Sequence, residues 1–358
     1  MKKIVMVDLY AQYKTIKKEI DGAIKDVIKK SAFIGGEYVE KLETELAKKL
    51  KAKYCVALNS GTDALYLSLK ALGIKSGDEV ITTAFTFFAT AEVVARLGAK
   101  VVFVDIDPKT FNIDVNKIEE KITKKTKAII PVHIFGQVAE MDKIMKLAKK
   151  YDLKIIEDAC QAIGAKYKDK YAGTFGDTGC FSFFPSKNLG GWGDGGAIIT
   201  DSLEVAEKIK MMRNHGSKIK YFNDEIGYSS RLDGIQAAIL GVKLKHIDKW
   251  NKERQRVGKK YDKLLGNSNF VEGHVFHQYT FRVKNGKRDE LRKYLGENNI
   301  SSMIYYPLPI NKMKPFLGQK CSLPETEKAC REVLSLPIYP ELENKKIEGI
   351  CGKIIKFC

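Results

Sequence analysis

The sequence has no C-x-x-C pair, no long apolar run and no arginine-rich arm. Without paired spacing, the seven cysteines do not predict a zinc site or any other metal site, and we interpret them as reduced thiols of a cytoplasmic protein. No apolar run approaches the roughly 20 residues that a membrane span needs. The apolar residues 4–7 end at Asp8, too early for the core of a signal peptide. We therefore expect a cytoplasmic protein with no metal and no membrane partner.

Positive charge is abundant, with 62 Lys and Arg against 44 Asp and Glu and a net charge of +18. The lysines are spread along predicted helix faces, usually beside acidic residues, and no patch interleaves basic with aromatic side chains. We interpret them as a solvated surface, and nucleic-acid binding stays a minor alternative. An anionic substrate would be attracted by this charge in either case.

Short apolar segments alternate with helical patterns through the first 245 residues. The predicted strands are residues 54–58, 80–83, 101–104, 128–134, 154–158 and 196–200. The predicted helices are residues 12–30, 37–50, a segment starting near 64, 85–98, 139–150 and 203–213. This alternation predicts an α/β fold with a mostly parallel sheet between helices, and ligands at the carboxyl ends of its strands.

The last third of the sequence has a different pattern. A helix begins near Asp233, and a long charged helix over residues 245–265 ends at Gly266. Beyond it, the predicted strands are residues 275–283 and 302–306, and the predicted helices are residues 287–298 and 325–334. We expect a large domain of residues 1–245 and a small antiparallel α+β domain of residues 246–358.

Lys187 lies in an unusual setting for a lysine. An aromatic strand, residues 181–184, runs into a Pro-Ser turn, and glycines follow the lysine. A partly desolvated lysine loses preference for its proton and becomes a nucleophile for Schiff-base chemistry with an aldehyde. The alternative is an ordinary exposed loop lysine.

Two further stretches follow predicted strands. Residues 59–63, Asn-Ser-Gly-Thr-Asp, open a helix, where free N–H groups and the helix dipole attract an anion. The alternative there is a plain helix cap. Glu157 and Asp158 lie on opposite faces of a strand end, so one can point into a site and bind a cationic ring nitrogen. An N-cap or a structural ion pair is the alternative.

These stretches together resemble the DegT/DnrJ/EryC1/StrS family of nucleotide-sugar aminotransferases, which use pyridoxal 5'-phosphate on the fold-type I scaffold. The resemblance covers nearly the whole chain and rests on seven segments in family order: residues 59–65, 85–90, 157–162, 181–188, 195–197, 231–240 and 305–307. Relatives that dehydrate their substrate have His at the lysine position. This chain keeps Lys187, so the resemblance implies transamination.

The resemblance also implies residue roles. Lys187 would form the Schiff base and move protons, and Asp158 would bind the pyridinium nitrogen. The other implied cofactor contacts are Gln161 to the ring oxygen, Phe87 to the ring face, and Gly61, Thr62, Asp63 and Ser182 to the phosphate. Ser229 stands where the family commonly has Asn reaching the partner subunit's cofactor, so this contact is open or water-mediated.

The expected function is amino transfer from glutamate, which leaves as 2-oxoglutarate, to a keto sugar linked to a nucleoside diphosphate. We expect a homodimer with shared sites, with Arg231, Tyr305 and Tyr306 as candidate substrate contacts. Arg231 has a helix-capping alternative, and His133 and His215 are interpreted as structural. Similarity of motifs favours C3 of a dTDP- or UDP-linked sugar. The alternatives are C4 amination of a 4-keto-6-deoxy sugar and a non-catalytic regulatory protein that binds the cofactor.

Overall fold

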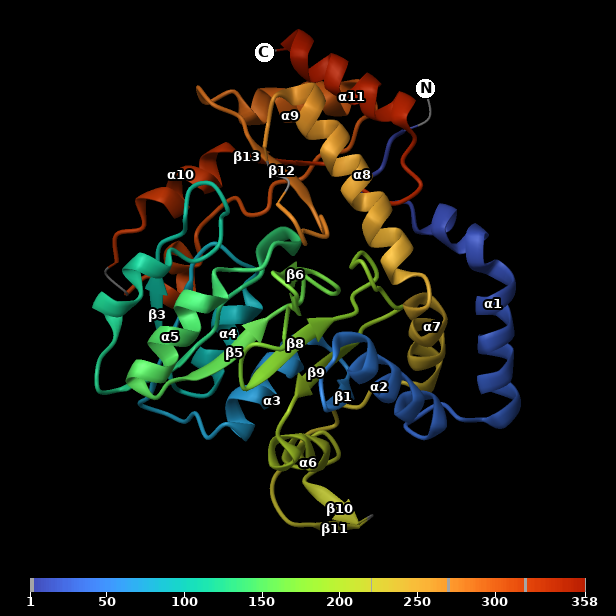
Figure 1. Ribbon diagram of the computed structural model, residues 1–358, viewed down its shortest axis with the longest axis vertical. Coiled ribbons are helices and arrows are strands. Elements are labelled where there is room, and N and C mark those ends of the chain that lie inside the picture. Colours follow the sequence, from blue (N-terminus) through green and yellow to red (C-terminus); the bar gives the residue numbers. More distant parts are fainter. Residues whose placement is uncertain (1–2, 220, 269–270, 319–320, 358) are drawn as a thin grey trace.

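The computed structural model describes residues 3–219, 221–268, 271–318 and 321–357. Figure 1 shows a central sheet surrounded by helices, with the C-terminal segments gathered at one end and the long helix α8 leading to them. Ile4 pairs with Ile300 in an isolated parallel bridge, so the N-terminal segment joins the C-terminal segments. The architecture is therefore α/β, as the alternation of the sequence predicts.

The central sheet has seven strands in the order β1-β9-β8-β5-β4-β2-β3. Their bounds are β1 Tyr54–Leu58, β2 Glu79–Thr83, β3 Lys100–Val104, β4 Thr126–Ile129, β5 Lys154–Asp158, β8 Thr178–Ser182 and β9 Gly196–Thr200. The strands β8, β5, β4, β2 and β3 are parallel neighbours, which confirms the mostly parallel sheet. The strand β9 is antiparallel to both β1 and β8, and this was not predicted.

Each face of the sheet is covered by its own apolar core. Ile155 belongs to the core that includes residues of α2, α5 and α7, whereas Ile156 belongs to the core of α3, α4 and α6. Adjacent strand residues point to opposite faces, so a sheet buried on both sides needs a continuous apolar run. The helices are α2 Glu37–Leu50, α3 Gly61–Ala71, α4 Ala89–Arg96, α5 Met141–Tyr151, α6 Leu203–Met212 and α7 Gly234–Leu244.

The first helix, α1 (Leu9–Lys30), lies at the edge of the molecule and packs on α7 (Figure 1). Ile16 and Ile20 are buried against Ile239 and Val242. The Asp8 carboxylate accepts a hydrogen bond from the Ala11 backbone N–H at 2.8 Å and caps the helix start. The helix therefore begins three residues before the predicted start at residue 12.

The C-terminal segments have a core of their own, formed by buried residues from Val257 to Ile354. Their elements are α8 Ile247–Leu265, β12 Tyr279–Arg282, α9 Arg288–Glu297, α10 Pro324–Glu332, β13 Val333–Leu336 and α11 Asn344–Phe357. The strands β12 and β13 are antiparallel. Gly266 ends α8 with a φ of +67°, a conformation that glycine adopts without strain. We keep residue 245 as the proposed domain boundary because α8 leads from α7 to this separate core.

The C-terminal strands differ from the prediction. The predicted strand at residues 302–306 is wrong, since among the described residues Met303 makes only an isolated bridge with Ser335. The strand β13 occupies part of the predicted helix 325–334, and α11 was not predicted. Short strands are β6 Lys166–Tyr167, β7 Lys170–Tyr171, β10 Ser217–Ile219 and β11 Phe222–Asn223; the short 3-10 helices are Val115–Lys117, Glu119–Lys121, Ile134–Gly136, Ile310–Lys312 and Lys314–Phe316.

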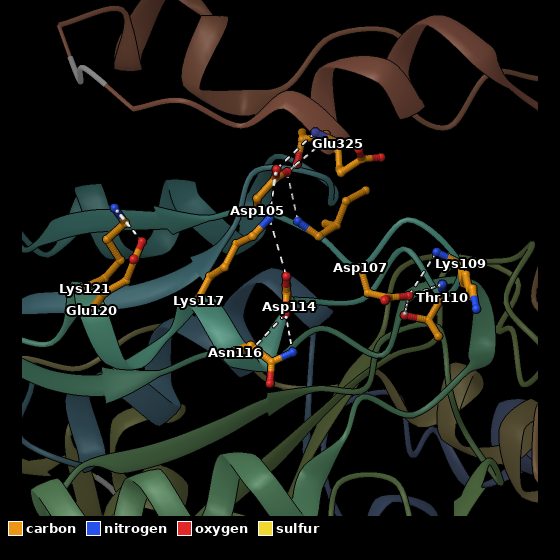
Figure 2. Close-up of polar contacts among 12 residues, drawn as sticks. Asp105, Asp107, Lys109, Thr110, Asp114, Asn116, Lys117, Glu120, Lys121 and Glu325 are labelled. Atoms are coloured by element: carbon orange, nitrogen blue, oxygen red, sulfur yellow. Dashed lines mark hydrogen bonds and ion pairs between the residues drawn. The ribbon is translucent and has the colours of Figure 1, made fainter.

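Asp105, just after β3, joins the sheet to α10 (Figure 2). Its buried carboxylate accepts hydrogen bonds from the backbone N–H groups of Glu325 and Thr326 at 3.0 and 2.8 Å, in the first turn of α10. The Lys117 ammonium lies 3.6 Å away. Burial alone would raise the pKa of Asp105, but the hydrogen bond from the Thr326 hydroxyl at 2.8 Å and those from the backbone N–H groups outweigh burial and lower it. The carboxylate therefore stays charged, and it holds α10 against the end of β3.

Among the described residues, no helix is both long enough and apolar enough to cross a bilayer.

Candidate active site

The carboxyl ends of several strands meet at one edge of the sheet. Since β9 is antiparallel to both β1 and β8, the strands β1, β8 and β5 run in the same direction. Ser60 follows β1, Ser182 ends β8, and Asp158 ends β5. The chain order and the sheet order therefore bring three of the predicted segments to the same edge.

Glu157 and His133 form a buried structural pair. The Glu157 carboxylate accepts three backbone N–H groups, from Gly173 at 2.7 Å, Phe175 at 2.6 Å and Gly176 at 2.8 Å. His133 Nε2 lies 2.8 Å from the same carboxylate, while its Nδ1 accepts the Ala139 N–H at 3.2 Å. Nε2 must then carry the ring proton. Glu157 is thus fully engaged in holding the backbone, and His133 is structural, as expected.

Asp158 faces the other way and keeps acceptor capacity. Thr90 Oγ1 donates to its Oδ2 at 2.7 Å, and the Cys160 N–H donates to Oδ1 at 3.2 Å. Thr86 Oγ1 lies 3.0 Å from Thr90 Oγ1 and extends the network. Within the described residues no basic side chain forms an ion pair with Asp158. A buried carboxylate with only neutral donors is well suited to a cationic N–H ligand.

The Lys187 amine is desolvated. The residue as a whole is half-buried, and burial lowers the pKa of its amine against the opposing charge of Asp158. Across the described parts of the chain the amine has no hydrogen-bond or ion-pair partner. The Lys187 N–H donates to Phe184 O at 2.8 Å, which makes the turn that carries the side chain out of the aromatic strand. The nucleophilic, neutral form of the amine is therefore favoured.

The turn before α3 combines a side-chain cap with close packing against β8. Ser60 caps α3, since its Oγ accepts the Asp63 N–H at 3.0 Å, and the first-turn N–H groups of Gly61 and Thr62 have no intrahelical acceptor. A Cβ at Gly61 would lie 2.7 Å from Ser182 Cβ and 2.9 Å from Cys160 Sγ. Only glycine therefore allows this turn to approach Ser182. The helix cap is therefore confirmed, and phosphate binding by the Gly61 and Thr62 N–H groups stays a prediction.

Gln161 connects the site to Tyr306. Its Oε1 accepts the Phe135 N–H at 2.8 Å, and its Nε2 donates to the Tyr306 hydroxyl at 3.1 Å. One Nε2 hydrogen is left for a ligand. Burial raises the pKa of both Tyr305 and Tyr306, so both phenols stay neutral. The structure thus brings Tyr306 together with Gln161 at the strand edge.

Ser229 and Arg231 are not in direct contact with these residues. Arg231 Nη2 donates to Ser229 Oγ at 3.0 Å and Nη1 to Asn214 Oδ1 at 3.2 Å. Arg231 lines a hollow of about 490 Å³ whose lining also includes Lys210, Arg213 and Lys218. Phe87 follows the buried Thr86, and its side chain is 59% exposed. Within one chain, the site therefore lacks the contribution expected from residues 229–231.

Sequence reasoning missed several polar residues of this region. Thr86 and Thr90, which reach Asp158, belong to a segment that was quoted only for its resemblance. His277 and Lys243 are buried, although an isolated His and a helical Lys carry no such signal in the sequence. Burial is the largest cause that holds the pKa of His277 well below its usual range.

These residues fit pyridoxal 5'-phosphate. Asp158 can accept from a pyridinium N–H, the first turn of α3 can bind a phosphate, and Lys187 offers a neutral amine to an aldehyde. Among the described residues there is no group of three or more His, Cys, Asp or Glu side chains placed to hold a metal ion. A mostly parallel sheet with a lysine and an aspartate at its carboxyl edge defines the class of pyridoxal-phosphate-dependent enzymes of fold type I.

The model of the DegT/DnrJ/EryC1/StrS aminotransferase family matches residues 14–355, and the chain belongs to this family. It is a sugar aminotransferase whose cofactor is pyridoxal 5'-phosphate.

Proteins that are similar to this chain include two relatives and one solved crystal structure. A protein named pleiotropic regulatory protein from Geobacillus stearothermophilus is 50% identical over 99% of this chain and 98% of its own length. The UDP-2-acetamido-2-deoxy-3-oxo-D-glucuronate aminotransferase of Pseudomonas aeruginosa is 43% identical over 98% of this chain and 99% of its own. The crystal structure of S. venezuelae DesV in complex with a ketimine intermediate superposes with a TM-score of 0.96 and 36% identity, covering 100% of this chain and 99% of that one.

Proposed function

We propose that this protein transfers the amino group of L-glutamate to C3 of a keto sugar linked to UDP or dTDP. The products would be the 3-amino sugar nucleotide and 2-oxoglutarate. The observation that carries the proposal is the Lys187 amine, whose pKa burial lowers, near the same strand edge as Asp158, a carboxylate with no basic partner among the described residues. The choice of C3 is supported by the 3-oxo sugar in the name of the Pseudomonas relative.

The cofactor supplies an electron sink for the bond changes at carbon. Asp158, oriented by Thr90 and the Cys160 N–H, keeps a proton on the ring nitrogen. Gln161 and Phe87 would hold the ring, while the N–H groups of Gly61 and Thr62 and the Ser182 hydroxyl would hold the phosphate. The Asp63 N–H, also predicted to bind the phosphate, donates to Ser60 Oγ instead. Lys187 Nζ removes the α-proton of glutamate in the first half-reaction and delivers a proton to C3 of the sugar in the second. Burial lowers the pKa of this amine, which favours the form that accepts the α-proton, and the ammonium so formed is the form that can deliver a proton.

Two copies of the chain would complete the site. The hairpin β10–β11 and the turn after it expose large apolar side chains, including Ile219 at 68%, Phe222 at 70% and Ile226 at 88%. Figure 1 places this hairpin at the end opposite the C-terminal segments. Exposed apolar patches of this kind mark interaction surfaces. We assign them to a homodimer in which residues 227–231 of one chain face the partner's cofactor, with Arg231 near the diphosphate and Tyr305 and Tyr306 near the sugar.

We expect sedimentation to give a dimer, and Ile226→Asp to shift it to a monomer with little activity, because the charge would have to be buried in the interface. Ile355→Asp, at a 60% exposed residue of α11, is the matched control and should stay dimeric. Ser229→Asn should be tolerated or should tighten cofactor retention. A fully active monomer at assay concentration would refute the shared site.

The sugar carbon that receives the amino group is identified by running the reaction in the reverse direction. We expect glutamate to form from 2-oxoglutarate and a 3-amino sugar nucleotide, because C3 must reach the cofactor amine while the diphosphate lies on basic groups. UDP- and dTDP-linked sugars are compared with 3-amino and 4-amino groups, and Lys187→Ala serves as the blank. If glutamate forms only from the 4-amino sugars, the amino group is transferred to C4 and not to C3. The proposal of an aminotransferase reaction would still hold.

The second candidate is a regulatory protein that binds the cofactor without turnover, and the name of the Geobacillus relative favours it. A regulator has no need of a residue that moves protons, which the unpaired Lys187 amine is suited to be. Production of 2-oxoglutarate from glutamate by the purified protein would exclude it.

Nucleic-acid binding is the remaining alternative. It would show as a shift in gel mobility that weakens as salt is added.

A further inference from the structure

The lysine loop, residues 187–193, is anchored at its start by the buried side chains of Asn188 and Leu189 and is rich in glycine beyond them. It holds Gly190, Gly191 and Gly193, and glycines leave a backbone many conformations. A Cβ at Gly190 would lie 2.3 Å from Pro185 O, and one at Gly191 would lie 2.7 Å from Gln236 Oε1. The close packing thus requires glycine, and the loop must be ordered by contacts from outside.

Three polar side chains of α7 and α8 make such contacts. Gln236 Oε1 accepts the Trp192 N–H at 2.7 Å, and Lys243 Nζ donates to Gly190 O at 2.7 Å. Asn251 Oδ1 accepts from Asn188 Nδ2 at 2.8 Å, and that nitrogen also donates to Val275 O at 3.0 Å. The lysine loop is therefore bonded at three places along its length to the helices that lead into the C-terminal segments.

Lys243 is the least expected of the three. Its side chain is 1% exposed, and among the described residues no carboxylate pairs with it. Burial lowers the pKa of its amine to about 8. A buried amine without a counter-ion is costly, and an apolar side chain would fill the same space at no such cost. Both the charged and the neutral amine carry N–H groups, so the bond to Gly190 O is available in either form.

We propose that Lys243 is a positioning residue: with Gln236 and Asn251 it fixes the glycine-rich lysine loop, so that the Lys187 amine is held where it must transfer protons. This inference rests on the proposed role of Lys187. Gly190 O is a buried carbonyl that needs a donor, and an aliphatic side chain at residue 243 would leave it unpaired. The proton-transfer step requires close alignment, and a displacement of about 1 Å can lower a rate by as much as 10²-fold.

The test is Lys243→Met in the holoenzyme, since methionine keeps a long unbranched side chain and removes the donor. Amide hydrogen exchange, followed by mass spectrometry, should become about tenfold faster in residues 188–193 and stay unchanged in β2 and β4. The kcat should fall about tenfold or more, with KM for both substrates and cofactor content near the wild-type values. Lys245→Met, at an exposed lysine on the same helix end, is the matched control and should change neither quantity.

Gln236→Leu gives an independent measurement, because it frees the Trp192 N–H without touching Lys243. It should also speed exchange in the lysine loop and lower kcat. The exchange measurement needs no turnover, so it tests the contacts even if the proposed reaction is wrong. Unchanged exchange in residues 188–193 of both variants would overturn the inference. A uniform rise in amide hydrogen exchange across the sheet of the Lys243→Met variant, with kcat per folded enzyme unchanged, would also overturn the inference. Lys243 would then contribute to the stability of the whole fold and not to the position of the lysine loop.

Discussion

Lys187→Ala is expected to abolish amino transfer while the fold stays intact. The amine contributes the group that binds the cofactor covalently and the group that moves protons, and general acid–base catalysis alone accounts for about 10²–10⁴-fold in rate. The unfolding transition should change little, since the amine makes no hydrogen bond or ion pair in the described structure. Formation of 2-oxoglutarate from glutamate measures the activity, and circular dichroism measures the fold.

Lys124→Ala is the matched control, because Lys124 is an exposed lysine without a hydrogen bond or ion pair among the described residues. It should keep full activity and the yellow colour of the bound cofactor. Lys187→Ala should bind the cofactor reversibly and lose it on dialysis. A Lys187→Ala variant with more than a tenth of the wild-type rate would show that another group moves the protons.

Asp158→Asn should still bind cofactor and lose turnover by about 10²–10³-fold. A neutral amide cannot keep the ring nitrogen protonated, and loss of one preorganised electrostatic contact typically costs this much. Thr90 Oγ1 and the Cys160 N–H both donate to Asp158, so in the amide variant the Thr90 hydroxyl would have to turn and accept from the new NH2 group. The measurements are kcat in the glutamate half-reaction and the absorption spectrum of the bound cofactor.

Glu157→Gln is the control that separates the two neighbouring acids. Glu157 holds three backbone N–H groups and His133, so its amide variant should lower the melting temperature. The kcat per folded molecule should remain near wild type. The reverse pattern, with Asp158→Asn active and Glu157→Gln stable but inactive, would assign the cofactor contact to Glu157.

The sequence predicted elements well where a local pattern decides the structure. The helix Glu37–Leu50 and the strand Tyr54–Leu58 have the predicted bounds, because caps and apolar spacing are local signals. The antiparallel direction of β9 depends on how the chain returns from β8. Residues 183–195 contain no crossover helix, and a parallel return needs one. The helix α11 had a usable signal in the spacing of Ile347, Ile350, Cys351 and Ile354.

In the candidate site, too, the sequence did not reveal features that depend on contacts between distant segments. Sequence placed Glu157 and Asp158 on opposite faces of a strand, yet only the packing shows that loop 173–176 surrounds Glu157 and leaves Asp158 at the site. Lys187 is half-buried as a residue, and burial lowers the pKa of its amine, in the direction that the sequence predicts. Lys243 was not singled out from the sequence, because the burial of its amine depends on a contact with the distant carbonyl of Gly190. Contacts between segments far apart in the chain were therefore beyond the reach of local patterns.

The central claim is that Lys187 is the residue that carries the cofactor. The most direct measurement is reduction of the yellow holoenzyme with borohydride, digestion, and mass spectrometry of the labelled peptide. We predict a single pyridoxyl group on Lys187, in the peptide that begins at Tyr171 or later and contains residues 181–187. A label on Lys243, or on any lysine other than Lys187, would contradict this account.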